Sequence, residues 1–235
     1  MKFNTKTIHG GQENVDPAYG SVMPPIYQTS TYSQSTPGGH KGFEYSRSGN
    51  PTRATLEKSL ASIENGNYGL AFGSGLAAID AVIKLFKPGD EIISTNDLYG
   101  GSYRLFTSIF EGLGIKFHFI GMQEAAKIEE HINSNTKLIW VETPTNPMMN
   151  IIDIEAVSKI AKKNDLLLAV DNTFATPYLQ QPLDLGADIV MHSATKYLGG
   201  HSDVVMGGLV VKDEKLAEKL YFIQNASGAV CGPQD

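Results

Sequence analysis

The chain has 235 residues, 41% hydrophobic and 19% charged, a balance typical of a globular protein with a large core. Its net charge of −6 and its lack of a basic stripe argue against a nucleic-acid partner. No apolar run is long enough to span a bilayer, and no signal-peptide core follows Met1. The single cysteine, Cys231, leaves neither a disulfide framework nor a cysteine metal cluster. We therefore expect a cytoplasmic protein with no membrane partner and no metal site.

The N-terminal segment shows no sustained hydrophobic period. It is punctuated by turn-forming residues, namely Pro17, Pro24, Pro25, Pro37, Gly38 and Gly39. We expect residues 1–47 to form an extended arm that lies on a neighbouring subunit, and residues 48–235 to form one large domain.

The rest of the chain alternates between short apolar runs and segments of helical spacing. Strands are expected at 68–72, 91–95, 116–120, 138–142, 166–170, 188–191 and 207–211. Helices are expected at 51–64, 75–86, about 105–113, 124–132, 154–163 and 213–224. This order predicts an α/β fold with a mostly parallel sheet and helices on both faces.

Polar side chains follow two of the later predicted strands. Asp171 ends one apolar run, and Ser193, Thr195 and Lys196 follow the next. Because ligands of parallel sheets bind at the carboxyl ends of strands, we expect these groups to converge. A desolvated lysine amine forms a Schiff base with a carbonyl such as that of pyridoxal phosphate. The alternative is an ordinary surface lysine and a loop acid.

The residues around this lysine resemble a known signature. DNTFATP at 171–177 and LGADIVMHSATKYLGGHSD at 185–203 closely resemble the lysine region of the Cys/Met-metabolism pyridoxal-phosphate enzymes. The resemblance extends from KTIHGGQ at 6–12 to the last residue. It implies a fold-type I large domain, pyridoxal 5'-phosphate as cofactor, and a homotetramer built as a dimer of dimers.

The resemblance also implies roles for individual residues at the cofactor. Lys196 would bind the cofactor covalently and move protons, and Asp171 would face the ring nitrogen. Tyr99 would stack on the ring, contact the substrate and take part in proton transfer. The remaining cofactor-binding residues on the same chain would be Gly75, Leu76, Asn146, Thr173, Ser193 and Thr195.

Three further residues take roles from the resemblance alone. Tyr45 and Arg47 would bind the cofactor phosphate of a neighbouring subunit, whereas their spacing alone suggests only a polar loop before a helix cap. Arg104 would lie near the substrate, although a surface ion pair is nearly as good an interpretation. His192 and His201 lack metal-ligand spacing and are expected to be structural.

The expected reaction is γ-elimination or γ-replacement on a sulfur amino acid, as in cystathionine γ-lyase or γ-synthase. The alternatives within the family are cystathionine β-lyase and methionine γ-lyase, and Gly101 argues against the latter, which usually has cysteine there. Outside it, the chain could be a non-catalytic assembly half or a nucleotide-binding protein, but GxGxxG and P-loop patterns are lacking. The family continues beyond Asp235, so we also expect a C-terminal domain to be missing here.

Overall fold

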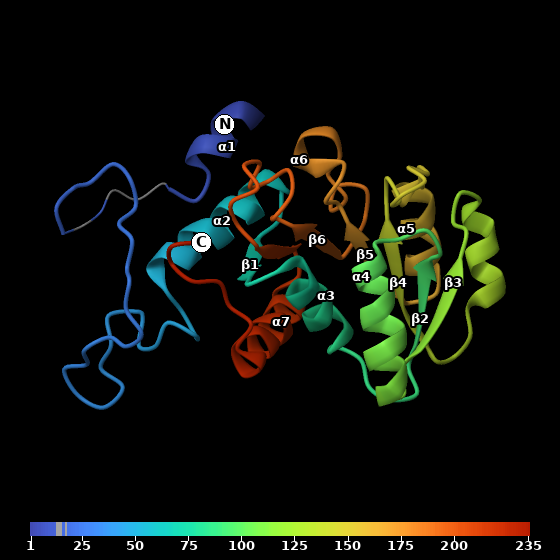
Figure 1. The fold of residues 1–235 in the computed structure, drawn as a ribbon, viewed down its shortest axis with the longest axis horizontal. Helices are drawn as coiled ribbons and strands as arrows, with labels where there is room; N and C mark the ends of the chain where they lie inside the picture. The colour runs from blue at the N-terminus through green and yellow to red at the C-terminus, as the bar shows by residue number, and fades with distance from the viewer. Residues whose placement is uncertain (13–15, 17) are drawn as a thin grey trace.

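The computed structural model describes residues 1–12, 16 and 18–235 (Figure 1). Its centre is a seven-stranded sheet with the order β1-β7-β6-β5-β4-β2-β3. The strands are β1 (Tyr68–Phe72), β2 (Glu91–Thr95), β3 (Lys116–Ile120), β4 (Thr136–Glu142), β5 (Leu167–Asp171), β6 (Ile189–Ser193) and β7 (Gly207–Val211). Only β7 runs against its neighbours β1 and β6, so the expected α/β fold with a mostly parallel sheet is confirmed.

Helices cover both faces of this sheet (Figure 1). The α-helices are α1 (Phe3–His9), α2 (Pro51–Ile63), α3 (Gly75–Ile83), α4 (Gly100–Leu105), α5 (Ile154–Lys163), α6 (Thr176–Leu179) and α7 (Glu214–Ser227). The segments η1 (Phe106–Phe110), η2 (Glu111–Leu113) and η3 (Ala125–His131) have π, 3₁₀ and 3₁₀ geometry, respectively.

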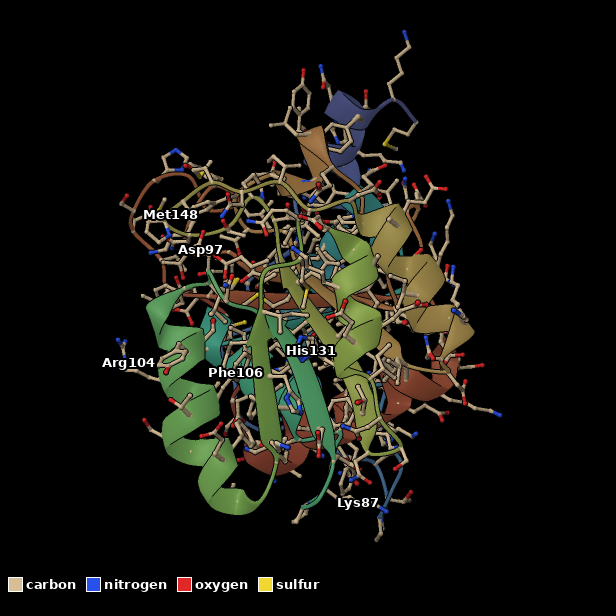
Figure 2. The ribbon with its side chains drawn as sticks, turned by 90° about the vertical axis from the view of Figure 1, so that its right-hand side faces the viewer. Lys87, Asp97, Arg104, Phe106, His131 and Met148 are labelled. Atoms are coloured by element: carbon tan, nitrogen blue, oxygen red, sulfur yellow. The ribbon has the colours of Figure 1, made fainter. Side chains whose placement is uncertain are left out.

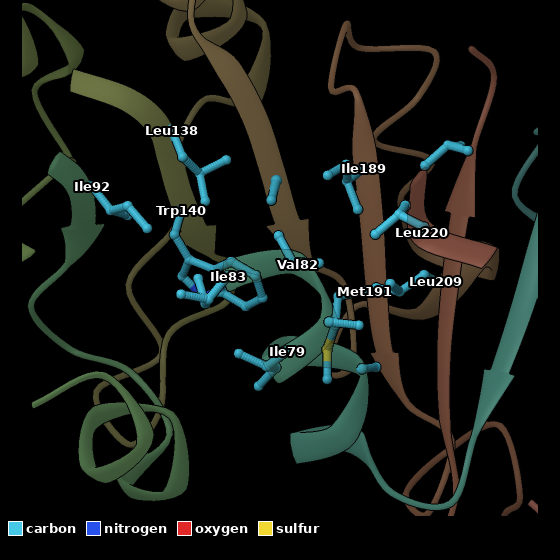
Figure 3. Close-up of a cluster of buried hydrophobic side chains, with 14 of the residues drawn as sticks. Ile79, Val82, Ile83, Ile92, Leu138, Trp140, Ile189, Met191, Leu209 and Leu220 are labelled. Carbon is cyan, nitrogen blue, oxygen red and sulfur yellow. The ribbon is translucent and has the colours of Figure 1, made fainter. Parts of the chain in front are cut away.

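Alternation along the strands divides the core into layers. Leu138 and Trp140 of β4 pack with α3, α4 and α7, together with Ala169 of β5 (Figure 3). The intervening Ile139 and Val141 pack instead against α5 and η3. Side chains two residues apart on a strand point to the same face of a sheet. Glu142 comes two residues after Trp140, and Asp171 comes two residues after Ala169, so both acids point to the α3 face.

Element boundaries differ modestly from the sequence expectations. The strand expected at 166–170 is shifted by one residue, so that Asp171 is its last member, and helix α3 ends at Ile83 rather than near Phe86. The helix expected at 105–113 is a composite of α4, η1 and η2, and the one at 124–132 is the 3₁₀ segment η3. Hydrophobic spacing locates such segments but does not distinguish helix types, because 3.0 and 3.6 residues per turn place similar residues inward over two turns.

The expectation of an arm that is extended from residue 1 to residue 47 is wrong at its start. Phe3–His9 forms helix α1, and its Lys6 ammonium donates a hydrogen bond of 2.8 Å to Asn65 at the end of α2. A seven-residue helix is too short to show a period, and contact with α2 stabilises it. Pro17, one of the residues behind the expectation, lies outside the described residues; the arm's contact with a neighbouring subunit stays a prediction.

Among the described residues, no helix is long and apolar enough to cross a bilayer. At the amino ends of the strands, opposite the edge where Asp171 lies, the Glu91 carboxylate accepts hydrogen bonds from Asn133 (2.9 Å) and from His118 (2.5 Å). The hydrogen bonds from Asn133 and His118, and to a smaller extent the charge of Lys116, lower the pKa of Glu91 to about 2.

We predict that Glu91→Gln lowers the free energy of unfolding by about 1 kcal/mol at pH 7, because a charge-assisted hydrogen-bond acceptor is lost. Glu91 has a lowered pKa, so its contribution is full above the ordinary value of 4.5 and disappears as the pH falls towards about 2. Urea melts at pH 7 and pH 3 measure this change. The control Glu124→Gln removes an exposed partner of Lys127 and should change stability by less than about 0.5 kcal/mol. Equal stability of Glu91→Gln and wild type at pH 7 would contradict the prediction.

Candidate functional site

A pocket of about 420 Å³ opens at the carboxyl edge of the sheet. Its lining residues come from the ends of β4, β5 and β6, from the start of α3 and from the loops that follow. They are Ser74, Gly75, Leu76, Ile79, Tyr99, Glu142, Asn146, Asp171, Thr173, Phe174, Met191, Ser193, Thr195, Lys196 and Val205. The structure therefore brings together Lys196, Asp171 and seven other residues that the sequence analysis placed at a cofactor.

Asp171 and Lys196 contribute opposite charges to this pocket. Asp171 is the last residue of β5 and is buried, whereas the Lys196 side chain is exposed. One Asp171 oxygen accepts a hydrogen bond of 3.0 Å from the backbone N–H of Thr173. Burial raises the pKa of the Asp171 carboxyl, and the hydrogen bonds from Thr173 and the nearby His192 oppose that rise. A cation placed beside Asp171 would remove most of the cost of its buried charge.

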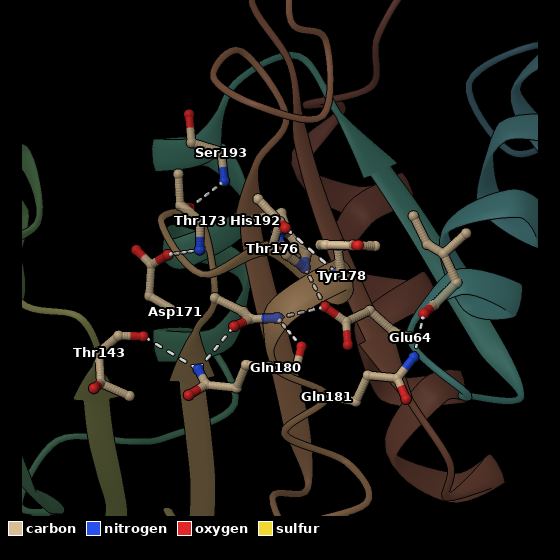
Figure 4. Close-up of polar contacts among 12 residues, drawn as sticks. Glu64, Thr143, Asp171, Thr173, Thr176, Tyr178, Gln180, Gln181, His192 and Ser193 are labelled. Carbon is tan, nitrogen blue, oxygen red and sulfur yellow. Dashed lines mark hydrogen bonds and ion pairs between the residues drawn. The ribbon is translucent and has the colours of Figure 1, made fainter. Parts of the chain in front are cut away.

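The loop after β5 connects Asp171 to the phosphate-binding candidates. The Thr173 hydroxyl accepts a hydrogen bond of 2.8 Å from the backbone N–H of Ser193 (Figure 4). The Ser193 hydroxyl has no hydrogen bond among the described residues. The Thr195 hydroxyl, in contrast, donates to the Met206 carbonyl at 3.2 Å and accepts from the Met206 N–H at 2.9 Å. Ser193 is therefore the more available hydroxyl of the two.

The start of α3 forms one wall of the pocket. The Ser74 hydroxyl caps the helix by accepting a hydrogen bond of 3.0 Å from the N–H of Ala77. The N–H groups of Gly75 and Leu76 have no acceptor among the described residues, and they sit at the positive end of the helix dipole. A β-carbon at Gly75 would lie 2.8 Å from the Ser193 β-carbon, so only glycine allows this close approach. The turn and Ser193 together make a site suited to a phosphate.

Two carboxyl groups lie side by side at the floor of the pocket. Glu142 and Asp171 are the last residues of the neighbouring parallel strands β4 and β5, and they are partners in the strand register. One Glu142 oxygen accepts a hydrogen bond of 2.8 Å from the backbone N–H of Tyr99. Burial, followed by the charge of Asp171, raises the pKa of Glu142 to about 8.

The loop that carries Asn146 is fixed by a carboxylate outside the pocket. Asp97 accepts hydrogen bonds from the Thr145 hydroxyl, from the Met148 N–H (3.1 Å) and from the Asn150 amide (3.3 Å). Figure 2 shows Asp97 and Met148 together at this edge of the sheet. Asp97 thereby holds both ends of a turn whose middle presents Asn146 to the pocket.

Behind the floor, a buried polar network connects α2 to the strand ends (Figure 4). Glu64, the residue after α2, lies 2.5 Å from His192 and accepts a hydrogen bond of 2.8 Å from Asn172. Gln180 donates to Asn172 at 2.9 Å and to the Thr143 carbonyl at 3.2 Å. This network fixes the residues that follow Glu142 and Asp171 and the one that precedes Ser193. It supports the expectation that His192 is structural.

The opposite end of α2 holds the loop that contains Tyr45 and Arg47. The buried guanidinium of Arg53 donates to the Ser46 carbonyl at 2.7 Å and to the Arg47 carbonyl at 3.0 Å. The Asn50 side chain accepts hydrogen bonds from the first turn of α2 and so caps the helix. Helix α2 therefore joins this loop to the network behind the pocket.

Three predicted site residues lie away from the pocket. Tyr45 and Arg47 line a separate hollow, where the Arg47 guanidinium donates to the Asn225 carbonyl at 2.7 Å and lies 5.3 Å from the Tyr45 ring centre. Arg104 is exposed on α4 and points away from the sheet (Figure 2). The roles assigned to these three residues stay predictions.

The sequence analysis did not name several residues of the pocket, and Glu142 is the most consequential. Its position was visible, because it ends a predicted strand just as Asp171 does. Phe174 and Val205 carried no comparable signal, since they lie in loops whose path depends on tertiary packing. The chemistry of Glu142 depends on its neighbour across β4 and β5, and that pairing requires the strand order.

The comparisons with known proteins agree with this geometry. The family model described as Cys/Met metabolism PLP-dependent enzyme matches residues 4–235. This chain belongs to that family. A cystathionine γ-lyase of Bacillus subtilis is 53% identical over 235 residues, covering 100% of this chain and 62% of the relative. A cystathionine β-lyase of Coxiella burnetii is 49% identical, with coverage of 99% and 60%.

A solved structure shows the same fold. Cystathionine γ-lyase from Lactobacillus plantarum, complexed with L-serine, superposes with a TM-score of 0.97 at 49% identity, covering 100% of this chain and 61% of that one. The chain thus spans about three fifths of the length of these relatives. Its family membership is established for residues 4–235.

The residues present fit pyridoxal phosphate. The cavity volume lies within the range usual for small-molecule sites. It contains an amine, two free backbone N–H groups with an unpaired hydroxyl beside them, and a buried carboxylate that lacks a cationic partner within the described chain. These groups match the aldehyde, the phosphate and the ring nitrogen of the cofactor, in that order.

We predict that Gly75→Ala weakens the binding of pyridoxal phosphate about tenfold or more, because the new methyl group displaces Ser193 and obstructs the two N–H groups. Equilibrium dialysis of purified protein measures this loss. The matched control is Gly73→Ala in the same turn, where the nearest atom, the Val230 carbonyl oxygen, would be 3.4 Å from the new β-carbon. Wild-type affinity in Gly75→Ala would show that the phosphate binds elsewhere.

Proposed function

We propose that this chain is the cofactor-binding part of a carbon–sulfur lyase that removes the sulfur substituent from the γ-carbon of cystathionine or a similar amino acid. One observation carries the proposal: Lys196 and Asp171 line a single pocket in a chain of this family. The relative named cystathionine γ-lyase, at 53% identity, supports the choice of reaction.

Bound pyridoxal phosphate supplies an aldehyde that condenses with amines and a ring that withdraws electrons from the α-carbon of an amino acid. Lys196 is the amine that would hold it, and once free would take the α-proton and exchange protons at the β-carbon. Tyr99, at the pocket rim, would cover one side of the reacting atoms and assist proton transfer. The Asp171 carboxylate would keep the ring nitrogen of the cofactor positively charged. The α3 turn would hold the phosphate.

Several related reactions use the same residues. A γ-synthase or β-lyase would need Lys196, Asp171 and Tyr99 in the same places, whereas Gly101 continues to argue against a methionine γ-lyase. Incubation of the full-length protein with cystathionine distinguishes them. With addition of water, γ-elimination yields cysteine, 2-oxobutanoate and ammonia, and β-elimination yields homocysteine, pyruvate and ammonia. Cysteine and activated homoserine, offered together, yield cystathionine as the main product with a γ-synthase.

The assembly proposed is a homotetramer in the cytoplasm in which Tyr45 and Arg47 bind the phosphate of a neighbouring subunit. Their separation from the Lys196 pocket supports action in trans. The planar, permanently charged guanidinium of Arg47 suits a phosphate. In the single chain it lies on a carbonyl in the last turns of α7, an acceptor that a phosphate would readily replace.

We predict that Lys196→Ala abolishes the absorption band of covalently held cofactor in the purified protein, because Lys196 is the one lysine among the described residues that line the pocket. Borohydride reduction and peptide mapping of wild type should then find the label on Lys196. The control Lys212→Ala removes a lysine that is paired with Asp184 far from the pocket, and should leave the band intact. A label on a different lysine would refute the assignment.

A second prediction concerns the neighbouring subunit. Full-length subunits with Arg47→Ala and with Lys196→Ala should each be nearly inactive, but each mixed dimer should regain up to about half of the wild-type activity per dimer, because one of its two pockets then has both residues. Activity after controlled unfolding and refolding of the mixture measures this recovery. If subunit exchange is demonstrated by mass spectrometry and activity stays at the level of the separate variants, Arg47 acts within its own chain.

A further inference from the structure

Glu142 is a buried carboxyl that the proposed reaction does not yet use. Its side chain lines the pocket, and the residue is only 5% exposed, against 6% for Asp171. Of its two oxygens, only Oε2 has a hydrogen-bond donor among the described residues, the backbone N–H of Tyr99 at 2.8 Å. The other oxygen is free to face a ligand in the pocket.

The sheet places Glu142 directly beside Asp171. The two residues are register partners on parallel strands, and adjacent strands lie about 4.8 Å apart. Both belong to the side-chain rows that face α3, which contain Trp140 and Ala169. Two ionised carboxylates at this spacing, away from water, repel each other strongly. In the absence of a cation the pair therefore favours a state with one proton.

The charged groups around the pair do not supply that cation. Asp97 faces Glu142 from the loop after β2 and is negative. His192 faces Asp171 from the opposite side of the sheet and is paired with Glu64. Lys196 lines the same pocket, but it is exposed and is the amine assigned to the cofactor aldehyde. The missing positive charge must come with a ligand.

We propose that Glu142 and Asp171 act as one acid pair that faces the ring nitrogen of pyridoxal phosphate. The pair keeps a single proton in the cofactor-free protein. When the protonated ring nitrogen arrives, that proton leaves Glu142 for solvent and both carboxylates share the cation. Burial, together with the charge of Asp171, raises the pKa of Glu142 to about 8, in agreement with a retained proton. This inference rests on the proposed cofactor site.

Glu142 also connects the ring nitrogen to the position of Tyr99. Its Oε2 atom holds the Tyr99 N–H, and Tyr99 lies at the rim of the same pocket. A change in charge at Glu142 alters the strength of that hydrogen bond, because a carboxylate is a stronger acceptor than a carboxylic acid. Binding of the cation would thereby tighten the loop that carries the tyrosine.

Glu142→Gln tests the proposal, because the amide keeps an oxygen for the Tyr99 N–H and cannot ionise. Full-length protein loaded with ¹⁵N-labelled pyridoxal phosphate reports ring protonation through the ¹⁵N chemical shift. We expect the ring nitrogen to lose its proton about one to two pH units lower in Glu142→Gln than in wild type, given one charge fewer within several ångströms. A purely structural role for Glu142 would leave this titration unchanged.

The matched control is Asp188→Asn, which removes one carboxyl from the amino end of β6, on the far side of the sheet, and should titrate like wild type. If wild type binds pyridoxal phosphate and its ring nitrogen loses the proton at the same pH in Glu142→Gln, the acid pair is refuted but the proposed cofactor site is not. If wild type itself does not bind pyridoxal phosphate, the proposed function fails first.

If Glu142→Gln does not bind pyridoxal phosphate, thermal melts of the cofactor-free proteins test whether Glu142 retains a proton. Wild type keeps the Glu142 proton up to about pH 8, whereas its unfolded chain loses it near 4.5, so wild-type stability falls as pH rises through this window. The Tm of Glu142→Gln minus that of wild type should therefore increase from pH 5 to pH 8. A constant difference in Tm across that range would contradict the proposal that the two acids share one proton.

Discussion

The site depends on one constraint: a charge buried at the end of a strand must be compensated. Asp171 ends β5 inside the protein, and Glu142 ends β4 next to it, so the sheet presents two neighbouring acids, neither of which forms an ion pair among the described residues. Burying charges in this way costs free energy that hydrophobic packing elsewhere offsets. A ligand with a positive nitrogen removes that cost on binding. The pocket is thus electrostatically prepared for its cofactor before the cofactor is present.

The remaining elements hold this arrangement in place. Polar groups behind the floor, from Glu64 to Gln180, satisfy the backbone and side chains that follow each strand. The α3 turn approaches Ser193 so closely that a methyl group would not fit. Asp97 fixes the loop of Asn146 from outside. The groups behind the floor and Asp97 lie outside the pocket, and together they restrict the positions of the residues that line it.

The sequence pattern allowed the sheet, most of its helices and four of the pocket's residues, Asp171, Ser193, Thr195 and Lys196, to be predicted for a physical reason, whereas the other five came from the family resemblance. Apolar runs identify strands, and polar residues immediately after them must lie at one edge of a parallel sheet. Three things were not predictable in this way. The helix at Phe3–His9 exists through contact with α2, the importance of Glu142 arises from its neighbour across the sheet, and the engagement of the Thr195 hydroxyl by Met206 depends on the path of a loop.

Helix α2 has a consequence for how the assembly tolerates mutation. It spans about 20 Å, and its ends are tied to different places: Arg53 grips the loop of Tyr45 and Arg47, and Glu64 supports the floor behind Asp171. If that loop serves a neighbouring subunit, one helix supports two pockets in two chains. A destabilising substitution in α2 would then be dominant, because a mixed dimer of variant and wild-type subunits would have both of its cofactor sites impaired. Inheritance of such a defect would differ from that of a lesion at Lys196, which spares the partner's pocket.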